Sequence, residues 1–311
     1  MNSGSLSQRP AWSPIRSVLA VAGHELADAV RSRRAVVLLL MYFLGALAAT
    51  LIFVKVLHEV ENRIESAVGV AQSDRAGGAT STLWHNRHFR EMLIHLTGDE
   101  KLALELLSMP PLGVFYGWLC FTFGPLLVVL MSSARISEEI WSGSVRFALF
   151  RTSRLAWCMG KYVGQACLLL AAMLVSGLAA WCVGWFRFAG FESVPNAAAI
   201  AMFAIKGWLY ALAYLGLATA VSQMVASPNL ASALGFVGMV VMGIVSAVAG
   251  HFSGGGWRAL LELVNILTPG GHKLDLWRLD PAHVLPAAVF MVVLSLAYVL
   301  AGHLSFARRD L

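Results

Sequence analysis

Residues 132–162, SSARISEEIWSGSVRFALFRTSRLAWCMGKY, form a polar stretch between two apolar ones and carry an excess of positive charge. Two acids, Glu138 and Glu139, face five bases: Arg135, Arg146, Arg151, Arg154 and Lys161. Residues 144–150 are amphipathic, because Arg146 can point to water while the apolar side chains contact apolar neighbours: Val145, Phe147, Ala148 and Leu149. We expect a short helix that lies flat on the cytosolic membrane surface, where a soluble partner could bind and displace it.

The chain as a whole is too apolar for a soluble protein. Of its 311 residues 58% are hydrophobic and 13% are charged, and the mean hydropathy is +0.71, whereas soluble domains carry about a quarter charged residues. A segment that crosses lipid must satisfy its own backbone hydrogen bonds, which a helix does. The composition therefore predicts an all-α polytopic membrane protein.

Roughly 20 apolar residues cross the hydrocarbon core of a bilayer, and six stretches have this length. We predict transmembrane helices at 35–57, 112–134, 162–185, 198–221, 230–250 and 284–306. Between them we expect a polar outer domain at 58–111, a cytosolic segment at 135–161 and outer interfacial helices at 251–283. Residues 1–34 are predicted to be a cytosolic tail followed by an interfacial helix.

The interfacial helix is expected to begin at Ser13 and Pro14, a capping hydroxyl before a proline at the first helical position. Its apolar residues recur at helical spacing: Ile15, Val18, Leu19, Ala22, Leu26 and Val30. Its charged residues fall on the other side: Arg16, Glu25, Asp28 and Arg31. The run is too polar to span a membrane, so we expect it to lie in the interface.

Lys and Arg set the orientation of membrane proteins. With the N-terminus in the cytosol, the inner segments (1–34, 132–161, 222–229 and 306–311) hold twelve Lys/Arg and five Asp/Glu, a net charge of +7. The rest of the chain holds eleven and twelve, a net charge of −1. We therefore place both termini in the cytosol, and we interpret the overall charge of +6 as a topology signal rather than a sign of nucleic-acid binding.

Motifs for catalysis are not found in the sequence. Gly160-Lys161 does not complete a Walker A loop, because Leu155 stands where its first glycine is required and Tyr162 where it needs Ser or Thr. HExxH, GxSxG and paired-cysteine metal patterns are also lacking. None of the four cysteines falls in a candidate outer loop, so we expect no disulfides. No cleavable signal peptide is expected in residues 1–34.

Two features leave a different function open. His85 and His88 form an HxxH pattern near His95 and could bind a metal, although a solvated histidine-rich loop without a metal is favoured because no Cys or carboxylate completes a ligand set. Lys206 lies inside an apolar stretch and is a weak candidate for substrate contact, but it can also extend to the outer interface. The alternative is an intramembrane enzyme or an ion- or metal-conducting protein that uses these residues.

The order of residues in ISEEIWSGSVRFALFRTSRLAWCMGK (136–161) resembles the permease subunits of ABC-2 type ABC transporters. The positions that match the family pattern are Glu139, Gly143, Ser144, Leu149, Ser153, Arg154, Gly160 and Lys161. Arg151 departs from it, because the family often has proline there. HELADAVRSRR (24–34) looks like the family's N-terminal elbow helix, and FARRDL (306–311) looks like its usual ending.

This resemblance implies a permease of the bacterial inner membrane that is not itself an enzyme and holds no cofactor. Two separate ATP-binding subunits would bind ATP and Mg²⁺ and dock on the flat coupling helix, and export is the usual direction. The residues implied in coupling are Glu139, Gly143, Ser144, Arg146, Phe147, Leu149 and Arg154. A second permease chain, identical or related, is implied as a partner, and the outer domain at 58–111 could contact substrate or a periplasmic partner.

Overall fold

The computed structural model describes residues 14–68, 91, 94, 99–188, 191–251 and 264–308, and this part of the chain is helical, without a β-strand. Six of its helices are long and apolar enough to cross a membrane. They are α2 (Arg33–Val68), α6 (Pro111–Ser132), α9 (Arg154–Arg187), α10 (Ser193–Met224), α11 (Pro228–His251) and α14 (Pro281–Ala307). The predicted fold class, an all-α polytopic membrane protein with six spanning helices, is confirmed.

Capping residues determine where the long helices begin. The side chain of Ser153 accepts a hydrogen bond from the amide of Ala156, so α9 begins at Arg154, eight residues before the expected span. The carboxylate of Asp280 likewise caps α14, whose first residue is Pro281. The first two turns of α9 therefore belong to the polar segment 135–161, and they place its charges on a spanning helix.

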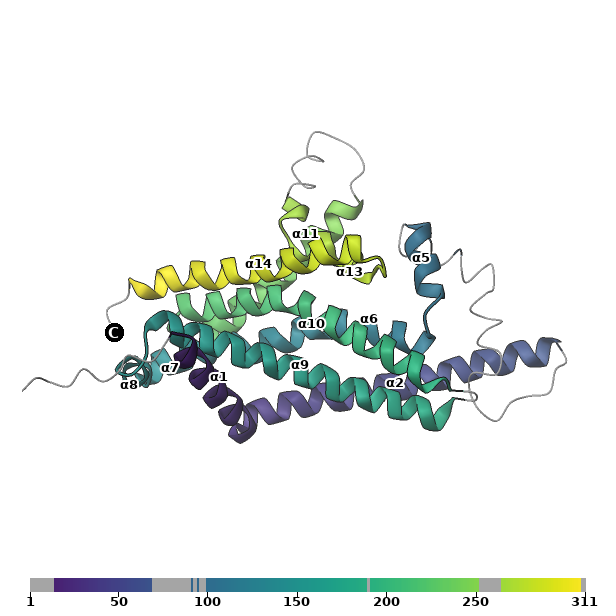
Figure 1. The fold of residues 1–311 in the computed structure, drawn as a ribbon, viewed down its shortest axis with the longest axis horizontal. Helices are drawn as coiled ribbons and strands as arrows, with labels where there is room; N and C mark the ends of the chain where they lie inside the picture. Colours follow the sequence, from purple (N-terminus) through teal and green to yellow (C-terminus); the bar gives the residue numbers. More distant parts are fainter. Residues whose placement is uncertain are drawn as a thin grey trace, which may run out of the picture.

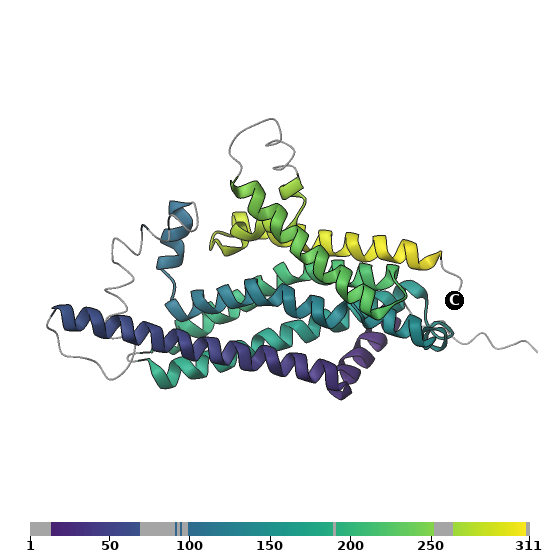
Figure 2. The same cartoon turned by 180° about the vertical axis from the view of Figure 1, so that it is seen from behind.

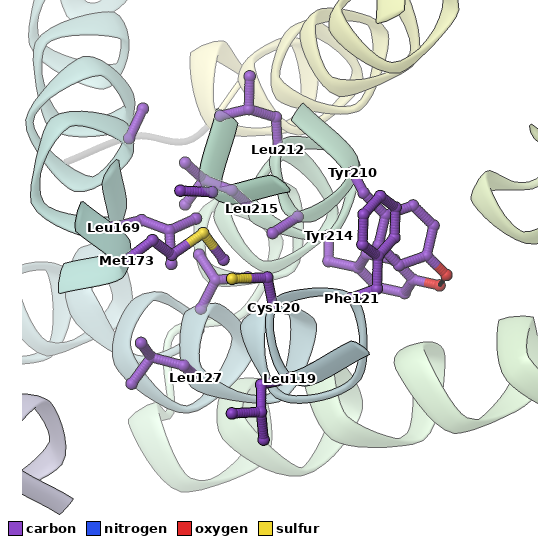
Figure 3. Packing of buried hydrophobic residues seen from close by; sticks show 14 of the residues in the cluster. Leu119, Cys120, Phe121, Leu127, Leu169, Met173, Tyr210, Leu212, Tyr214 and Leu215 are labelled. Atoms are coloured by element: carbon purple, nitrogen blue, oxygen red, sulfur yellow. Dashed lines mark hydrogen bonds between the residues drawn. The ribbon is translucent and has the colours of Figure 1, made fainter. Parts of the chain in front are cut away.

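The helix α10 lies at the centre of the bundle. Within its most apolar window 67% of the residues are buried, against 11% for both α2 and α11. Figure 3 shows the packing beside it: Leu215 of α10 lies close to Cys120 of α6 and to Leu169 and Met173 of α9. Within the described part of this chain, other helices therefore leave most of the apolar surface of α2 and α11 uncovered.

Close approach of α10 to α14 depends on a glycine. A Cβ atom at Gly216 would meet the backbone of Ser295, with Cα at 2.7 Å. At the same level Ser295 donates a hydrogen bond to the Leu212 carbonyl at 2.5 Å. Small residues allow such contacts between helices in a membrane, where packing and hydrogen bonds replace the hydrophobic effect.

The short helices gather at the two ends of the bundle (Figures 1 and 2). At one end lie α7 (Arg135–Ser142), α8 (Val145–Leu149), the first turns of α1 (Pro14–Arg31) and the C-terminal end of α14. Towards the other end lie α5 (Glu100–Leu107) and the last turns of α2. The two ends of the described chain therefore lie on the same side of the bundle, as six crossings require.

The segments predicted to lie outside the membrane, 58–111 and 251–283, are described only in part. Besides α5, they comprise η1 (Pro269–His272) and α13 (Lys273–Trp277), which precede α14. The Gly/Ala/Ser-rich middle of the segment 58–111 and most of the first expected interfacial helix after α11 lie outside the described residues.

We expect Gly216→Ala to destabilise the protein relative to the matched variant Gly243→Ala. Both substitutions add one methyl group to a spanning helix, but a Cβ at Gly243 meets nothing within 4 Å. Because two of the three nearest atoms that face Gly216 are backbone atoms of Ser295 and cannot rotate away, the difference should be about 1–3 kcal/mol. Denaturant unfolding in detergent, followed by tryptophan fluorescence, measures it, and equal stabilities of the two variants would contradict the packing described here.

Candidate functional site

The predicted coupling segment folds as two short helices at one end of the bundle. The chain turns between α7 and α8 at Gly143, whose φ of 73° is the left-handed conformation that residues with a Cβ rarely adopt. The N-terminal end of α7 is tied to α10, because the Ser222 hydroxyl accepts hydrogen bonds from the amides of Ile136 (3.0 Å) and Ser137 (3.1 Å). The position of α8 is thus fixed by a sharp turn and by an anchored helix.

One side of α8 is packed against the bundle and the other is exposed. Val145 is only 1% exposed and belongs to a cluster with Ile136, Trp157, Cys158 and Phe306. Phe147 and Phe150, in contrast, are 76% and 85% exposed. They are accompanied by three more exposed side chains of the same segment: Trp141, Arg146 and Arg151.

The expectation that Phe147 lies against apolar neighbours is therefore wrong for this chain. A helix of five residues can bury a single face, and Val145, Ala148 and Leu149 occupy it at i, i+3 and i+4. Phe147 lies on the opposite face with its ring in solvent, while Arg146 is exposed as expected. The exposed aromatic and basic side chains form what we call the tip surface: Trp141, Arg146, Phe147, Phe150 and Arg151.

A buried ion cluster lies behind the tip surface. The ammonium of Lys161, in the second turn of α9, contacts Glu25 Oε2 at 2.7 Å and Glu139 Oε1 at 2.5 Å. The amide of Gln165 donates to Glu25 Oε1 at 2.6 Å and accepts from the hydroxyl of Ser132 at 3.2 Å. One cation thus links α1, α7 and α9 directly.

Two glycines bring α1 close enough for this cluster to form. A Cβ at Gly160 would lie 2.9 Å from the Val18 carbonyl, and one at Gly164 would lie 2.8 Å from Glu25 Cβ. Glu25 is 4% exposed, so the expectation that it lies on the polar side of the interfacial helix is wrong. It faces α9 because its carboxylate finds Lys161 and Gln165 there.

Around this centre, further ion pairs are more exposed. Arg135 lies 3.8 Å from Glu25 and 3.4 Å from Asp28, and Arg34 contacts Glu138 at 2.6 Å. The Arg34–Glu138 pair is exposed on both sides and contributes about 0–1 kcal/mol, whereas the Arg135–Glu25 pair is largely buried. Their role is to keep α1, the start of α2 and α7 in register rather than to stabilise the fold strongly.

The electrostatic effect of the cluster is clearest at Glu25. Burial alone would raise the pKa of its carboxyl group. This effect is outweighed by Lys161, through its charge and its hydrogen bond, and by the charge of Arg135 and the hydrogen bond of Gln165. The pKa of Glu25 is therefore lower than usual. Glu25 is ionised at neutral pH, which the pairing with Lys161 requires.

Arg154 has a different role from Glu139. Its guanidinium donates to the carbonyls of Phe306 (3.2 Å) and Ala307 (2.9 Å), the last turn of α14. These carbonyls lie at the C-terminal end of α14, which carries the negative end of the helix dipole and favours a cation. Trp157 stacks on Phe306 nearby, with ring centroids 5.8 Å apart. Arg154 thus ties the start of α9 to the end of α14.

Lys206 is hydrogen-bonded within the chain through its ammonium group. Its ammonium donates to the Arg278 carbonyl at 2.6 Å, and it is 6% exposed. The same loop is bound to α5, because Arg278 pairs with Asp99 at its N-cap and the Leu279 amide donates to Glu105 at 2.6 Å. These contacts give Lys206 a structural role, in which it holds the loop before α14 over α10.

The remaining candidates from the sequence are the histidines considered as metal ligands. His85, His88 and His95 lie outside the described residues. Within the residues that the structure describes, no group of three or more His, Cys, Asp or Glu could hold a metal ion.

A family model described as an ABC-2 family transporter protein matches residues 19–311. The chain belongs to this family. No curated protein matches it in sequence. As an ABC-2 family protein with six apolar helices, it is a multi-pass membrane protein of a transporter, and members of this family work with ATP-binding subunits in general.

Sequence reasoning on this ABC-2 family protein missed the charge cluster as a unit. It placed Glu139 in the coupling segment and matched Gly160 and Lys161 to a family pattern, but it did not pair them with the interfacial helix. One signal could have found the pairing. Gly160 and Gly164 are four residues apart on one face of α9 and flank Lys161, which indicates a close helix contact beside a buried charge.

Lys161→Met is expected to destabilise the ABC-2 protein by about 3–5 kcal/mol, because it leaves the two carboxylates of Glu25 and Glu139 without their shared cation. The control is Arg146→Met, which removes an exposed cation from the same segment and should change stability by about 0.5 kcal/mol or less. Denaturant unfolding in detergent measures both. Similar values for the two variants would show that the cluster contributes no more than a surface charge.

The stability of the protein should also depend on pH through Glu25. Since its folded-state pKa is lowered, ionised Glu25 stabilises the fold above its unfolded-state pKa of about 4.3, and this contribution is lost as pH falls through the folded value. The stability difference between the wild type and Glu25→Gln should therefore be constant near pH 7 and shrink below about pH 4. Unfolding midpoints of both proteins measured across this pH range test the prediction. A stability difference that grows on acidification would contradict it.

Proposed function

We propose that this chain is the membrane-spanning permease subunit of an ABC-2 transporter, driven by a separate ATP-binding subunit that docks on α7 and α8. The observation that carries the proposal is the tip surface. Phe147 and Phe150 project from the end of the bundle on a helix whose opposite face is fixed by Val145. Exposed aromatic rings beside arginines are the side chains that protein interfaces use as anchors.

The ion cluster supports the transmission of force from this surface. A partner that displaces α8 would also displace α7, because the two helices are joined by a single tight turn at Gly143. From α7 the displacement would reach α9 through the ion pair of Glu139 with Lys161, and α1 through the pair of Lys161 with Glu25. It would then reach α14, because Arg154 of α9 is hydrogen-bonded to the end of that helix. A partner with two nucleotide states could thus shift the helix bundle between two arrangements, provided that it contacts the tip surface differently in each.

The same proposal assigns the sides of the membrane. The end of the bundle that holds α7, α8 and the described termini is cytosolic, as the excess of Lys and Arg in these segments favours. The membrane is the bacterial inner membrane, and the direction is export. ATP and Mg²⁺ bind to the partner, while a second permease chain completes the path. The outer segment 58–111 would contact substrate or a periplasmic partner.

Phe147→Ser and Phe150→Ser are each expected to weaken binding of the ATP-binding subunit by about tenfold or more, because each removes an aromatic anchor. The control is Phe186→Ser, which changes an equally exposed phenylalanine (73%) near the opposite end of α9. Co-purification from detergent and ATPase activity of the assembled complex measure the effect.

Both tip substitutions alter exposed side chains, so folding should be unaffected. Normal binding and ATPase activity in the Phe147→Ser and Phe150→Ser variants, or an equal loss in Phe186→Ser, would contradict docking at α8.

A further inference from the structure

A groove at the cytosolic end of the bundle is not used by the proposed docking surface. It lies between the first turns of α2 and the last turns of α6 and has a volume of about 390 Å³. Its walls are formed by Arg33, Arg34, Val37, Leu38 and Leu130.

The groove changes from basic to apolar along the axis of α2. Arg33 and Arg34 are the first residues of the helix, and Val37 and Leu38 follow one turn later, on the order of 6 Å deeper at 1.5 Å per residue. Leu130 of α6 faces them and is 40% exposed. A phospholipid presents the same order, an anionic phosphate at the interface and an acyl chain beneath it.

The charges at the mouth of the groove leave room for an anion. Arg34 donates to Glu138 through Nη1, and a guanidinium has four further N–H donors. The side chain of Arg33 is exposed, and its guanidinium makes no hydrogen bond or ion pair with any residue that the structure describes. Two acids at this end of the bundle, Asp28 and Glu138, are paired with Arg135 and Arg34.

The adjoining helix indicates that this corner lies at the membrane surface. α1 ends at Arg31, where it meets the start of α2 (Figure 1), and its last apolar residue, Val30, is 73% exposed. Ile15 and Leu19, on the same helix, are 72% and 60% exposed. A helix that exposes both apolar and basic residues is typical of the interface between headgroups and acyl chains.

We propose that this groove binds one anionic glycerophospholipid, with its phosphate between Arg33 and Arg34 and an acyl chain along Val37, Leu38 and Leu130. Basic pockets between spanning helices on the cytoplasmic side suit anionic headgroups. The bound lipid would fix the corner between α1 and α2, and thereby the helix that carries Glu25.

The test is native mass spectrometry of the full-length protein in detergent, titrated with phosphatidylglycerol or with phosphatidylcholine. We expect one phosphatidylglycerol to bind more tightly than phosphatidylcholine. Arg33→Gln should weaken phosphatidylglycerol binding about fivefold. It should weaken phosphatidylcholine binding less, because the choline cation of that lipid already offsets the charge of its phosphate. Leu130→Trp, which fills the apolar part of the groove without changing a charge, should also weaken it.

The matched control is Arg16→Gln, which removes an equally exposed arginine from the other end of α1 and should leave lipid binding unchanged. Equal losses for Arg16→Gln and Arg33→Gln would overturn the proposal, since they would show attraction to net charge alone. So would an unaffected Leu130→Trp variant, or displacement of the lipid by millimolar inorganic phosphate, which would indicate a phosphate site. A groove covered by a second copy of the chain would bind neither lipid and would also overturn it.

Discussion

A single buried cation, Lys161, determines how the parts of this ABC-2 family protein fit together at the end that we propose is cytosolic. Its ammonium is held between the carboxylates of Glu25 and Glu139, and it is 6% exposed. A buried ion pair contributes little net stability compared with apolar packing, but it penalises every arrangement in which one partner is left alone. The cluster therefore specifies the relative positions of α1, α7 and α9 more than it strengthens their association.

The tip surface has two requirements, and different residues meet each of them. The docking helix must expose apolar rings, which destabilises an isolated five-residue helix, and it must keep a defined position. Val145 and the Gly143 turn supply the position, since one fills the cluster around Trp157 and the other brings α8 back beside α7. Phe147 and Phe150 are then left available for a partner.

Much of the fold could be predicted from the sequence because lipid imposes a strong constraint on composition. Six apolar stretches of sufficient length identify six helices, and the family pattern in 136–161 located the short helix around Val145. The helix starts at Arg154 and Pro281 were less predictable, because local caps at Ser153 and Asp280 extend the helices beyond the apolar core. Hydropathy does not detect such extensions.

The site was predicted only in part, and the reason is physical. Periodicity placed Glu25 on the polar face of its helix, but a buried carboxylate on α1 is stable only because Lys161 and Gln165 approach it from a helix 136 or more residues later in the chain. Likewise, the choice of which face of a five-residue helix packs inward depends on Trp157 and Phe306, which no local pattern reveals. Pairings between distant elements require the tertiary structure.

The unbroken course of α9 has a mechanical consequence. The helix contains 34 residues without a proline, so it is a stiff rod on the order of 50 Å long at 1.5 Å per residue. Its first turns carry Arg154 and Lys161 and its last turn lies towards the other end of the bundle. If such a rod pivots near the bilayer midplane, inward motion of one tip requires outward motion of the other. Opening at one membrane face would then accompany narrowing at the opposite face, with no hinge between them.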